Sequence, residues 1–286
     1  MIRVQRVKVN RSIGGDIVLL TALALFGSIM ALPMLYAISS SLKPLHEIWI
    51  FPPKFLVQNP TLKNFKDLLS LLSDSWVPFS RYIFNTLFIS IIGTGGHVII
   101  ASMCAYALSK HRFYGAKFMF KVIVLSLMFS SAVTYVPTYL VMSRLHLINR
   151  YSSLILPAFS SSLGLFLMKQ FMESMIPDVV LEAAKIDGAG ELRIFFTITM
   201  PMVKPAWLTL IVFSFQSLWN INGGIYIQRE ELKTLNYAVK QIVAGGVARA
   251  GAGAASIVFM MMLPIIVFIV TQSNIVETMS ASGIKE

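Results

Sequence analysis

Charged residues are absent from six long stretches of the chain, and these stretches determine the predicted architecture. A helix needs about 20 apolar residues to cross the ~30 Å hydrocarbon core of a bilayer, so each stretch is long enough for one crossing. Strand-like alternation of apolar and polar residues does not recur, which argues against a membrane barrel. The sequence therefore predicts an all-α integral membrane protein with six transmembrane helices. The six stretches are residues 17–42, 82–109, 122–143, 151–168, 205–228 and 250–276.

The composition agrees with a chain whose solvent is lipid. Of its 286 residues, 56% are hydrophobic and 13% are charged, which is about half the charged share of a soluble domain. We expect a single transmembrane domain over residues 1–286, made of a tail at 1–16, a six-helix region at 17–276 and a tail at 277–286. The single cysteine, Cys104, excludes an internal disulfide and, inside an apolar run, is expected to be buried.

The basic residues indicate which ends of the helices face the cytoplasm. Short loops rich in Lys and Arg stay inside; the connection at 110–121 carries four such residues, whereas the connection at 144–150 carries two. The N-terminal tail carries four more, so both termini and the connection containing residues 177–201 are predicted to be cytoplasmic. Contact with anionic lipid headgroups explains the net charge of +11, and no nucleic-acid binding is expected. These residues are Arg3, Arg6, Lys8, Arg11, Lys110, Arg112, Lys117, Lys121, Arg144 and Arg150.

The connection between the fourth and fifth stretches contains a short predicted helix. Pro177 marks its start and Gly188 its end. Beyond the turn, residues 192–200 are apolar enough to pack against the membrane helices, and Pro201 is expected to start the fifth crossing. One face of the short helix fits a shallow cleft on a partner protein, but it equally fits a helix lying in the headgroups with Gly188 as a C-cap. That apolar face consists of Val179, Ala183 and Ile186.

The same segment resembles the EAA signature of ABC-importer permeases. The matching residues are Glu182-Ala183-Ala184, then three residues, Gly188, nine residues and Ile198-Thr199-Met200-Pro201. Met200 stands where the signature usually has leucine, a swap that conserves volume. Asp187 and Lys204-Pro205 are similar to the sugar-transporter branch, which includes the second maltose-type permease subunit. Shorter matches lie elsewhere, among them Ser41-Leu-Lys43, Trp219-Asn220 and Lys233-Thr-Leu235.

The resemblance implies a type I ABC-importer permease of the bacterial cytoplasmic (inner) membrane, with residues 177–201 as a cytoplasmic coupling helix and turn. Implied partners are an ATPase dimer, a homologous second permease and an extracytoplasmic solute-binding protein, which the loop at 230–243 would contact. No G-x-x-x-x-G-K-[ST] phosphate loop occurs, so ATP-Mg is expected on the separate ATPase. No cofactor, metal or catalytic residue is expected in this chain. The residues implied in ATPase docking are Glu182, Ala183, Ala184, Asp187, Gly188, Ile198 and Pro201.

A carbohydrate, in particular an oligosaccharide, is the substrate that the resemblance implies. Sugars are polar and uncharged, so their path needs hydroxyl, amide and aromatic side chains. The serines are open to a second interpretation, close packing with bonds to carbonyls of their own helix. His97 also has two interpretations, a functional ionisable group or a neutral imidazole that packs against another helix. The candidate path residues are Tyr135, Tyr139, Ser160, Ser161, Gln216, Trp219 and Asn220.

Two other functions fit less well. An ion-coupled secondary transporter usually carries charged side chains in its spans, and the six stretches contain no Asp, Glu, Lys or Arg. Asp187-Gly188-Ala189 with Arg193 resembles the start of a phosphatidyl-alcohol transferase signature. That chemistry needs further aspartates to hold metal ions, and none follows Asp187. An ABC-importer permease for another small solute is the alternative that the spans leave open.

Overall fold

The computed structural model describes residues 13–73 and 76–282, and every regular element in these residues is a helix. This confirms the all-α prediction. The basic residues of the predicted N-terminal tail and the last four residues of the C-terminal tail lie outside the described residues. The chain divides into two compact units, one of Met1–Leu68 with Gly245–Val258 and one of Leu69–Ala244 with Phe259–Glu286.

The first unit consists of a long apolar helix and the loop that follows it. α1 (Ile13–Leu42) covers the first uncharged stretch and leaves most of its side chains exposed. The loop after α1 is held by the buried Asn64, whose Nδ2 donates to the carbonyls of Ser41 and Lys43 at 2.8 and 2.7 Å. Buried amides require such partners, so they define the conformation of this loop. The unit also contains α2 (Leu45–Ile48), the first part of α3 (Lys63–Ser73), η3 (Val247–Arg249) and the first turns of α14 (Ala250–Ser282).

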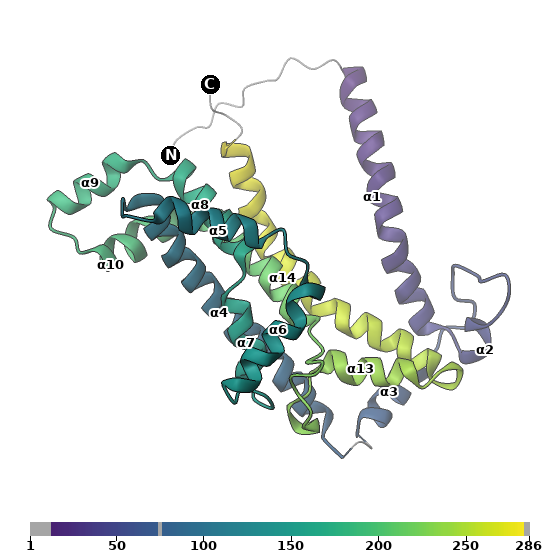
Figure 1. The fold of residues 1–286 in the computed structure, drawn as a ribbon. Helices are drawn as coiled ribbons and strands as arrows, with labels where there is room; N and C mark the ends of the chain where they lie inside the picture. Colours follow the sequence, from purple (N-terminus) through teal and green to yellow (C-terminus); the bar gives the residue numbers. More distant parts are fainter. Residues whose placement is uncertain (1–12, 74–75, 283–286) are drawn as a thin grey trace. The chain divides into compact units, whose positions relative to one another are not determined.

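α4 (Phe79–Lys110) is the central helix of the second unit, where it packs against α7 (Ser152–Phe159), α8 (Ser162–Met175) and α12 (Lys204–Trp219) (Figure 1). Glycines on α4 permit this close packing. A Cβ on Gly93 would overlap Leu218, and one on Gly96 would overlap Phe159. The other helices are α5 (Ala116–Ser126), α6 (Ser131–Arg144), α9 (Asp178–Ile186), α10 (Glu191–Ile194), η1 (Phe195–Thr199), α11 (Met200–Met202), η2 (Glu230–Leu232), α13 (Leu235–Ala244) and the rest of α14.

Among the described residues, four helices are long and apolar enough to cross a membrane: Gly14–Leu42, Phe79–Lys110, Ser152–Met175 and Val247–Gln272. The bent pair Glu191–Met202 and Lys204–Trp219, whose parts meet at 81°, would make a fifth crossing. The third uncharged stretch is divided between α5 and α6. Ser130 caps the second of these by accepting a hydrogen bond from the Ala132 amide at 3.3 Å. The count of six crossings therefore stays a prediction.

Two boundaries of the fifth stretch differ from the prediction. α12 ends at Trp219 and not at residue 228, because Gly223 and Gly224 have φ values of +75° and +46°, which a helix does not accommodate. Pro201 does not start the fifth helix; it lies in α11, and α12 begins at Lys204 beyond the bend. The segment directly before α11 is the π-helix η1, whose wider turns accompany this local irregularity.

Two further predictions are corrected: that the fourth crossing is uncharged and that Cys104 is buried. α8 continues to Met175 and includes Lys169 and Glu173, so the candidate crossing is not free of charge. The two side chains form an ion pair, and the Lys169 ammonium lies 4.1 Å from the centre of the Phe120 ring; both contacts lower the cost of burying the charge. Cys104 is exposed and not buried, because it lies on an outward side of α4 where an apolar thiol suits a lipid environment.

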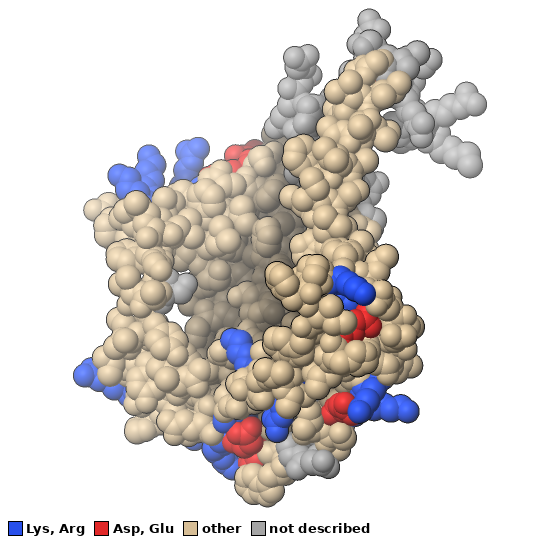
Figure 2. Space-filling view, turned by 90° about the vertical axis from the view of Figure 1, so that its right-hand side faces the viewer, with Lys and Arg blue, Asp and Glu red and all other residues tan. Residues whose placement is uncertain are grey.

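Apolar side chains cover much of the molecular surface. Figure 2 shows one face, on which most of the surface is uncharged and the charged side chains form small separate groups. Large apolar residues are widely exposed, for example Met30 at 77%, Phe118 at 71% and Val270 at 69%. Soluble monomers rarely expose apolar surface on this scale, whereas a surface that faces lipid requires it.

Candidate functional site

The short helix of the signature segment is α9, which begins after Pro177 and ends before a turn at Gly188. Gly188 has φ +79°, the left-handed region that favours glycine. Leu181 and Ala184 are buried beneath the helix, whereas Glu182 lies on its exposed side. The opposite apolar face is not covered by any of the described residues. That face, the α9 face below, consists of Val179 (73% exposed), Ala183 and Ile186 (86% exposed).

Two polar contacts hold the start of α9 to the end of α4. The Lys110 ammonium donates to the Ile176 carbonyl at 2.6 Å and to Asp178 Oδ1 at 2.7 Å. The Lys110 side chain is 7% exposed and Asp178 is 75% exposed, so the pair sits at the edge of the helix packing. The hydrogen bond from Lys110 and its positive charge lower the pKa of Asp178. Pro177 and Asp178 therefore start the helix and also position it.

The end of α9 is held by Glu191, at the start of α10. Its Oε1 lies 2.8 Å from the Lys185 ammonium. Its Oε2 accepts a hydrogen bond from the Tyr106 hydroxyl at 3.1 Å and lies 3.4 Å from His111 Nε2. One carboxylate thus joins α9 to the end of α4 across the Gly188 turn. The sequence pattern did not single out Lys110, Tyr106 or Glu191 for this role, because nothing in their spacing reveals contacts across 66 to 85 positions.

The second half of the signature lies against the helix bundle. Ile194, Phe195 and Thr199 are buried, and Ile198 is half-buried against the same core. Pro201 is exposed, as are Asp187 and Gly188. The predicted docking residues therefore separate into two groups. Glu182, Ala183, Asp187, Gly188 and Pro201 are accessible, whereas Ala184 and Ile198 pack inward.

A cavity of about 360 Å³ lies inside the second unit, between α4, the α7–α8 junction and α12. His97, from the middle of α4, reaches it and is 1% exposed. Gly164 leaves room for the imidazole, because a Cβ there would overlap His97 Nε2. Ser161, one of the predicted path residues, lies at the cavity. The other polar lining residues are Ser214 and Ser217, and the apolar ones include Leu154, Pro157, Leu210, Phe213 and Ile221.

Two predicted path residues belong to a separate group of tyrosines. The ring centroids of Tyr135 and Tyr139 lie 5.9 and 6.2 Å from that of Tyr226. Tyr226 was not among the predicted residues, because it falls in the loop that hydropathy alone assigns to a helix. Burial raises its pKa, and its hydroxyl donates to the Tyr135 carbonyl at 3.5 Å. The structure thus offers an aromatic surface at the α6 helix and the loop after α12.

Three of the four remaining predicted path residues use their side-chain polar atoms within the chain. Trp219 is 3% exposed, and its indole N–H donates to the Met260 carbonyl at 2.8 Å. Asn220 Nδ2 donates to the Gln216 carbonyl at 2.8 Å, and Ser160 Oγ to the Pro157 carbonyl at 2.9 Å. Gln216 itself is exposed. Trp219 therefore serves helix packing, while Asn220 and Gln216 remain at the surface.

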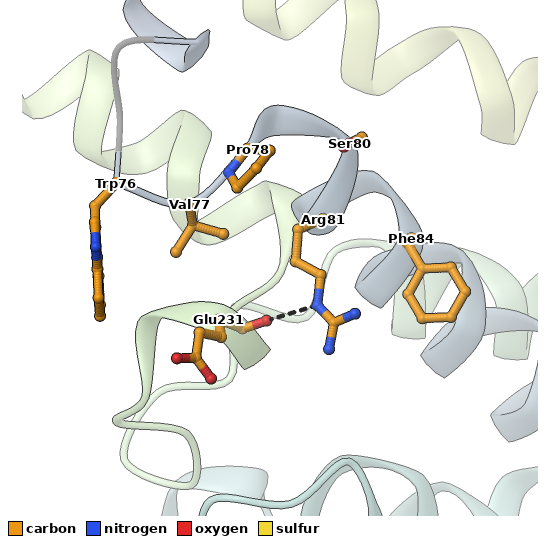
Figure 3. A pocket seen from close by; sticks show the side chains of 7 residues that line it. All are labelled: Trp76, Val77, Pro78, Ser80, Arg81, Phe84 and Glu231. Atoms are coloured by element: carbon orange, nitrogen blue, oxygen red, sulfur yellow. Dashed lines mark hydrogen bonds between the residues drawn. The ribbon is translucent and has the colours of Figure 1, made fainter.

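A second, larger pocket of about 560 Å³ lies at the first turn of α4 (Figure 3). Arg81 and Phe84 stand on one side of it and Trp76 on the other, with Glu231 below. Arg81 Nε donates to the Glu231 carbonyl at 3.2 Å, and Asn85 Nδ2 donates to the same carbonyl at 2.8 Å. These bonds fix the loop that contains η2 against α4.

Comparison with known proteins places the chain in a family, although no family model matches it. It is 29% identical over 240 residues to the polygalacturonan/rhamnogalacturonan transport system permease protein YtcP of Bacillus subtilis, covering 80% of this chain and 78% of that protein. It is 30% identical over 203 residues to the arabinooligosaccharides transport system permease protein AraQ of Halalkalibacterium halodurans, covering 69% and 70%. The chain belongs to the sugar-transporter branch of the ABC-importer permeases. This confirms the family that the EAA-like segment indicates.

The fold of the permease is also that of a solved transporter. The crystal structure of a bacterial ABC transporter involved in the import of the acidic polysaccharide alginate contains a chain that matches with a TM-score of 0.75. The match covers 93% of the permease and 99% of that chain, at 24% sequence identity. Both proteins therefore share the all-helical permease fold. The permease is a multi-pass membrane protein and a transport component.

Proposed function

We propose that this permease forms half of the translocation pathway of a binding-protein-dependent importer for an oligosaccharide. A homologous second permease would supply the other half. ATP would be bound as ATP-Mg and hydrolysed on a separate ATPase dimer, and the permease would have both termini in the cytoplasm. The observation that carries the proposal is the α9 face. It is an exposed apolar surface on the helix that ends at the left-handed glycine turn of the family's signature segment.

Docking to the ATPase is supported by the way α9 is presented. An amphipathic helix that binds in a groove places its apolar face against the partner, and Val179, Ala183 and Ile186 form such a face. The polar contacts of Lys110 and Glu191 tie both ends of α9 to α4, so a push on α9 reaches a membrane helix directly. Glu182, Asp187, Gly188 and Pro201 would form the rim of the docking surface, while Ala184 and Ile198 would hold the segment to the bundle.

The carbohydrate assignment rests on the named substrates of the relatives and on uncharged lining groups. Polygalacturonan or rhamnogalacturonan and arabinooligosaccharides appear in the relatives' names, and all are saccharides. Tyr135, Tyr139 and Tyr226 offer aromatic faces, and Ser161 offers a hydroxyl at the cavity. A sugar needs this combination of apolar faces and hydrogen-bonding groups. Gln216 and Asn220 would contribute amides from the exposed side of α12.

The solute-binding protein would contact the end of α4 that carries the Arg81 pocket. The loop at 230–243, fixed there by Arg81 and Asn85, is predicted to lie outside the cell. Trp76 is 86% exposed and Phe84 51%, and aromatic and Arg side chains are enriched where proteins bind each other. This surface would receive the loaded binding protein before the saccharide enters the pathway.

Two measurements test the proposal. The tagged permease should co-purify with an ATPase and a second permease, and Ile186→Asp should remove the ATPase because it places a charge in an apolar interface. Gln241→Asp, at an exposed position of α13, serves as the control and should retain it. The reconstituted importer should take up trigalacturonate or arabinotriose. Uptake of amino acids or phosphate with no saccharide would refute the substrate class while leaving the importer assignment intact.

A further inference from the structure

The cavity beside His97 contains an imidazole with one nitrogen unused. His97 Nδ1 is buried and has no hydrogen-bond partner among the described residues. The backbone of Phe159 lies close to the imidazole. A neutral imidazole whose Nε2 carries the hydrogen presents Nδ1 as an acceptor. In either tautomer, Nδ1 is a polar atom in a site where a missing partner is costly.

The opposite wall of the cavity supplies hydroxyl groups on one side of a helix. Ser214 and Ser217 are three residues apart on α12, so they face the same way, and Leu210 and Ile221 continue that side. Ser161 joins them from the junction between α7 and α8. Ser161 and Ser217 are exposed, so the cavity has an opening. Four polar groups around one opening are costly in lipid but suit a water-accessible interior.

The size and charge of the cavity limit what it can hold. A volume of about 360 Å³ falls within the ~300–1,000 Å³ typical of small-molecule sites. The lining contains no Asp, Glu, Lys or Arg, so a neutral group suits it better than an ion. A sugar ring presents apolar C–H faces and a rim of hydroxyls, which match the apolar walls and the serine and imidazole groups of this cavity.

We propose that this cavity is a subsite for one sugar ring of the transported saccharide, in which a hydroxyl of the ring forms a hydrogen bond with the imidazole of His97. Ser161, Ser214 and Ser217 bind further hydroxyls, and Phe213 packs against the ring. This inference rests on the proposed transport of a saccharide and adds a specific subsite within this subunit. His97 is then neither simply packed nor ionised. It is a polar group of the cavity whose ring is accommodated by Gly164.

The accessibility of the cavity is tested by thiol labelling in the complete purified importer, with Cys104 replaced by Ser. Ser217→Cys should react with sulfonatoethyl methanethiosulfonate about tenfold or more faster than Ile99→Cys, an exposed position of α4 outside the cavity, because thiolates form only where water reaches. A transported neutral saccharide, tested among arabinotriose and diacetylchitobiose, should slow the reaction at Ser217→Cys. An unreactive Ser217→Cys, or one that no transported saccharide slows, would overturn the subsite.

The role of His97 is tested by uptake and by ATP hydrolysis in the same preparations. His97→Leu should lower uptake about tenfold, in line with a lost hydrogen bond at a buried polar group, while binding-protein-stimulated ATP hydrolysis continues. His97→Asn, whose amide can stand near the Nδ1 position, should recover part of the uptake. Thr94→Val is the matched control, since Thr94 is buried on α4 and does not line the cavity. Normal uptake by His97→Leu would overturn the proposal. A wild-type importer that transports no saccharide would refute the proposed function as well.

Discussion

The His97 imidazole fills the space beside Gly164, which leaves no room for a side chain on residue 164. A Cβ on Gly164 would overlap the imidazole and would also approach Leu210 Cδ1 to 2.7 Å. The imidazole cannot withdraw easily, because it is 1% exposed and enclosed by α4, α8 and α12. In a closely packed interior, such an overlap forces helices apart or moves a side chain off its rotamer. The glycine therefore sets the distance between α4 and α8.

Gly164→Ala should destabilise the permease by about 1–3 kcal/mol, the usual cost of overpacking. Thermal unfolding of the purified importer, followed by loss of the assembled complex, measures this. His97→Ala in the same chain should recover most of the loss, because it vacates the space that the new methyl group needs. An additive double variant would show that the two residues do not share this space.

Gly188 offers a test of the turn that presents α9. Gly188→Val should cost about 1–2 kcal/mol in the turn, because a β-branched residue strongly disfavours positive φ. We expect less ATPase in the purified complex and less transport, with normal insertion in the membrane. Gly190→Val is the matched control, because Gly190 has φ −72° and open space around it. Equal ATPase content in both variants would contradict the role of the Gly188 turn.

Some of these residue-scale features could be predicted from the sequence and some could not. The Gly188 turn follows from local signals, namely a capped short helix and a glycine at its end. The pairing of His97 with Gly164 requires knowing that α4 and α8 touch, which no local pattern reveals. The same holds for Tyr226, whose position depends on where α12 ends. Features set by neighbouring residues could be predicted from the sequence. Contacts between distant segments could not, because they depend on how the helices pack.

At the scale of elements, hydropathy identified the membrane helices but not their interruptions. One uncharged stretch contains the end of α5 and nearly all of α6, and Ser130 is as acceptable in a continuous membrane helix as in a cap. α12 stops at Trp219 because of Gly223 and Gly224 beyond it, yet residues in this loop are apolar enough to extend the stretch. Hydropathy measures transfer into lipid and contains no term for backbone torsion, so it cannot place such breaks.

The attachment of α9 to α4 can be tested at Lys110. Lys110→Met should remove its bonds to Asp178 and the Ile176 carbonyl, at about 1–3 kcal/mol for a charged hydrogen-bonded group. Amide hydrogens of residues 178–186 should then exchange faster, while those in α12 remain protected. Lys117→Met, at an exposed position of α5, is the control. Unchanged exchange in α9 would contradict this attachment.

The pH dependence of this attachment follows from Asp178. Lys110 lowers its pKa in the folded chain, so the carboxylate contributes stability above the pKa it has when unfolded. That contribution is lost as the pH falls through the lowered folded value. The Lys110→Met effect on exchange should therefore be fully present at neutral pH and become smaller under acidic conditions.

At the scale of the whole molecule, the distribution of basic residues predicts the orientation of the chain in the membrane. In a Cys104-free background, cysteines at Tyr114 and Gly190 should be shielded from an impermeant thiol reagent in intact cells. Cysteines at Arg150 and Gln241 should react. Arg150 is preferred to its neighbour Asn149, because the Asn149 side chain accepts bonds from the Gln228 and Arg229 amides. Labelling of Gly190 from outside would reverse the predicted orientation.

The conformation of Gly188 also makes the turn sensitive to chirality. Apart from Gly188 and its two chain neighbours, no atom of the described residues lies within 4 Å of the position where a Cβ would stand. The space would therefore accept a methyl group, and only the torsion angle at φ +79° opposes one. For a residue of the opposite hand the same torsion is the relaxed one. A permease assembled by semisynthesis with D-alanine at this position should therefore couple as well as the natural chain, whereas L-alanine should not. At this one position, the family signature therefore selects the sign of the backbone torsion and not the size of the side chain.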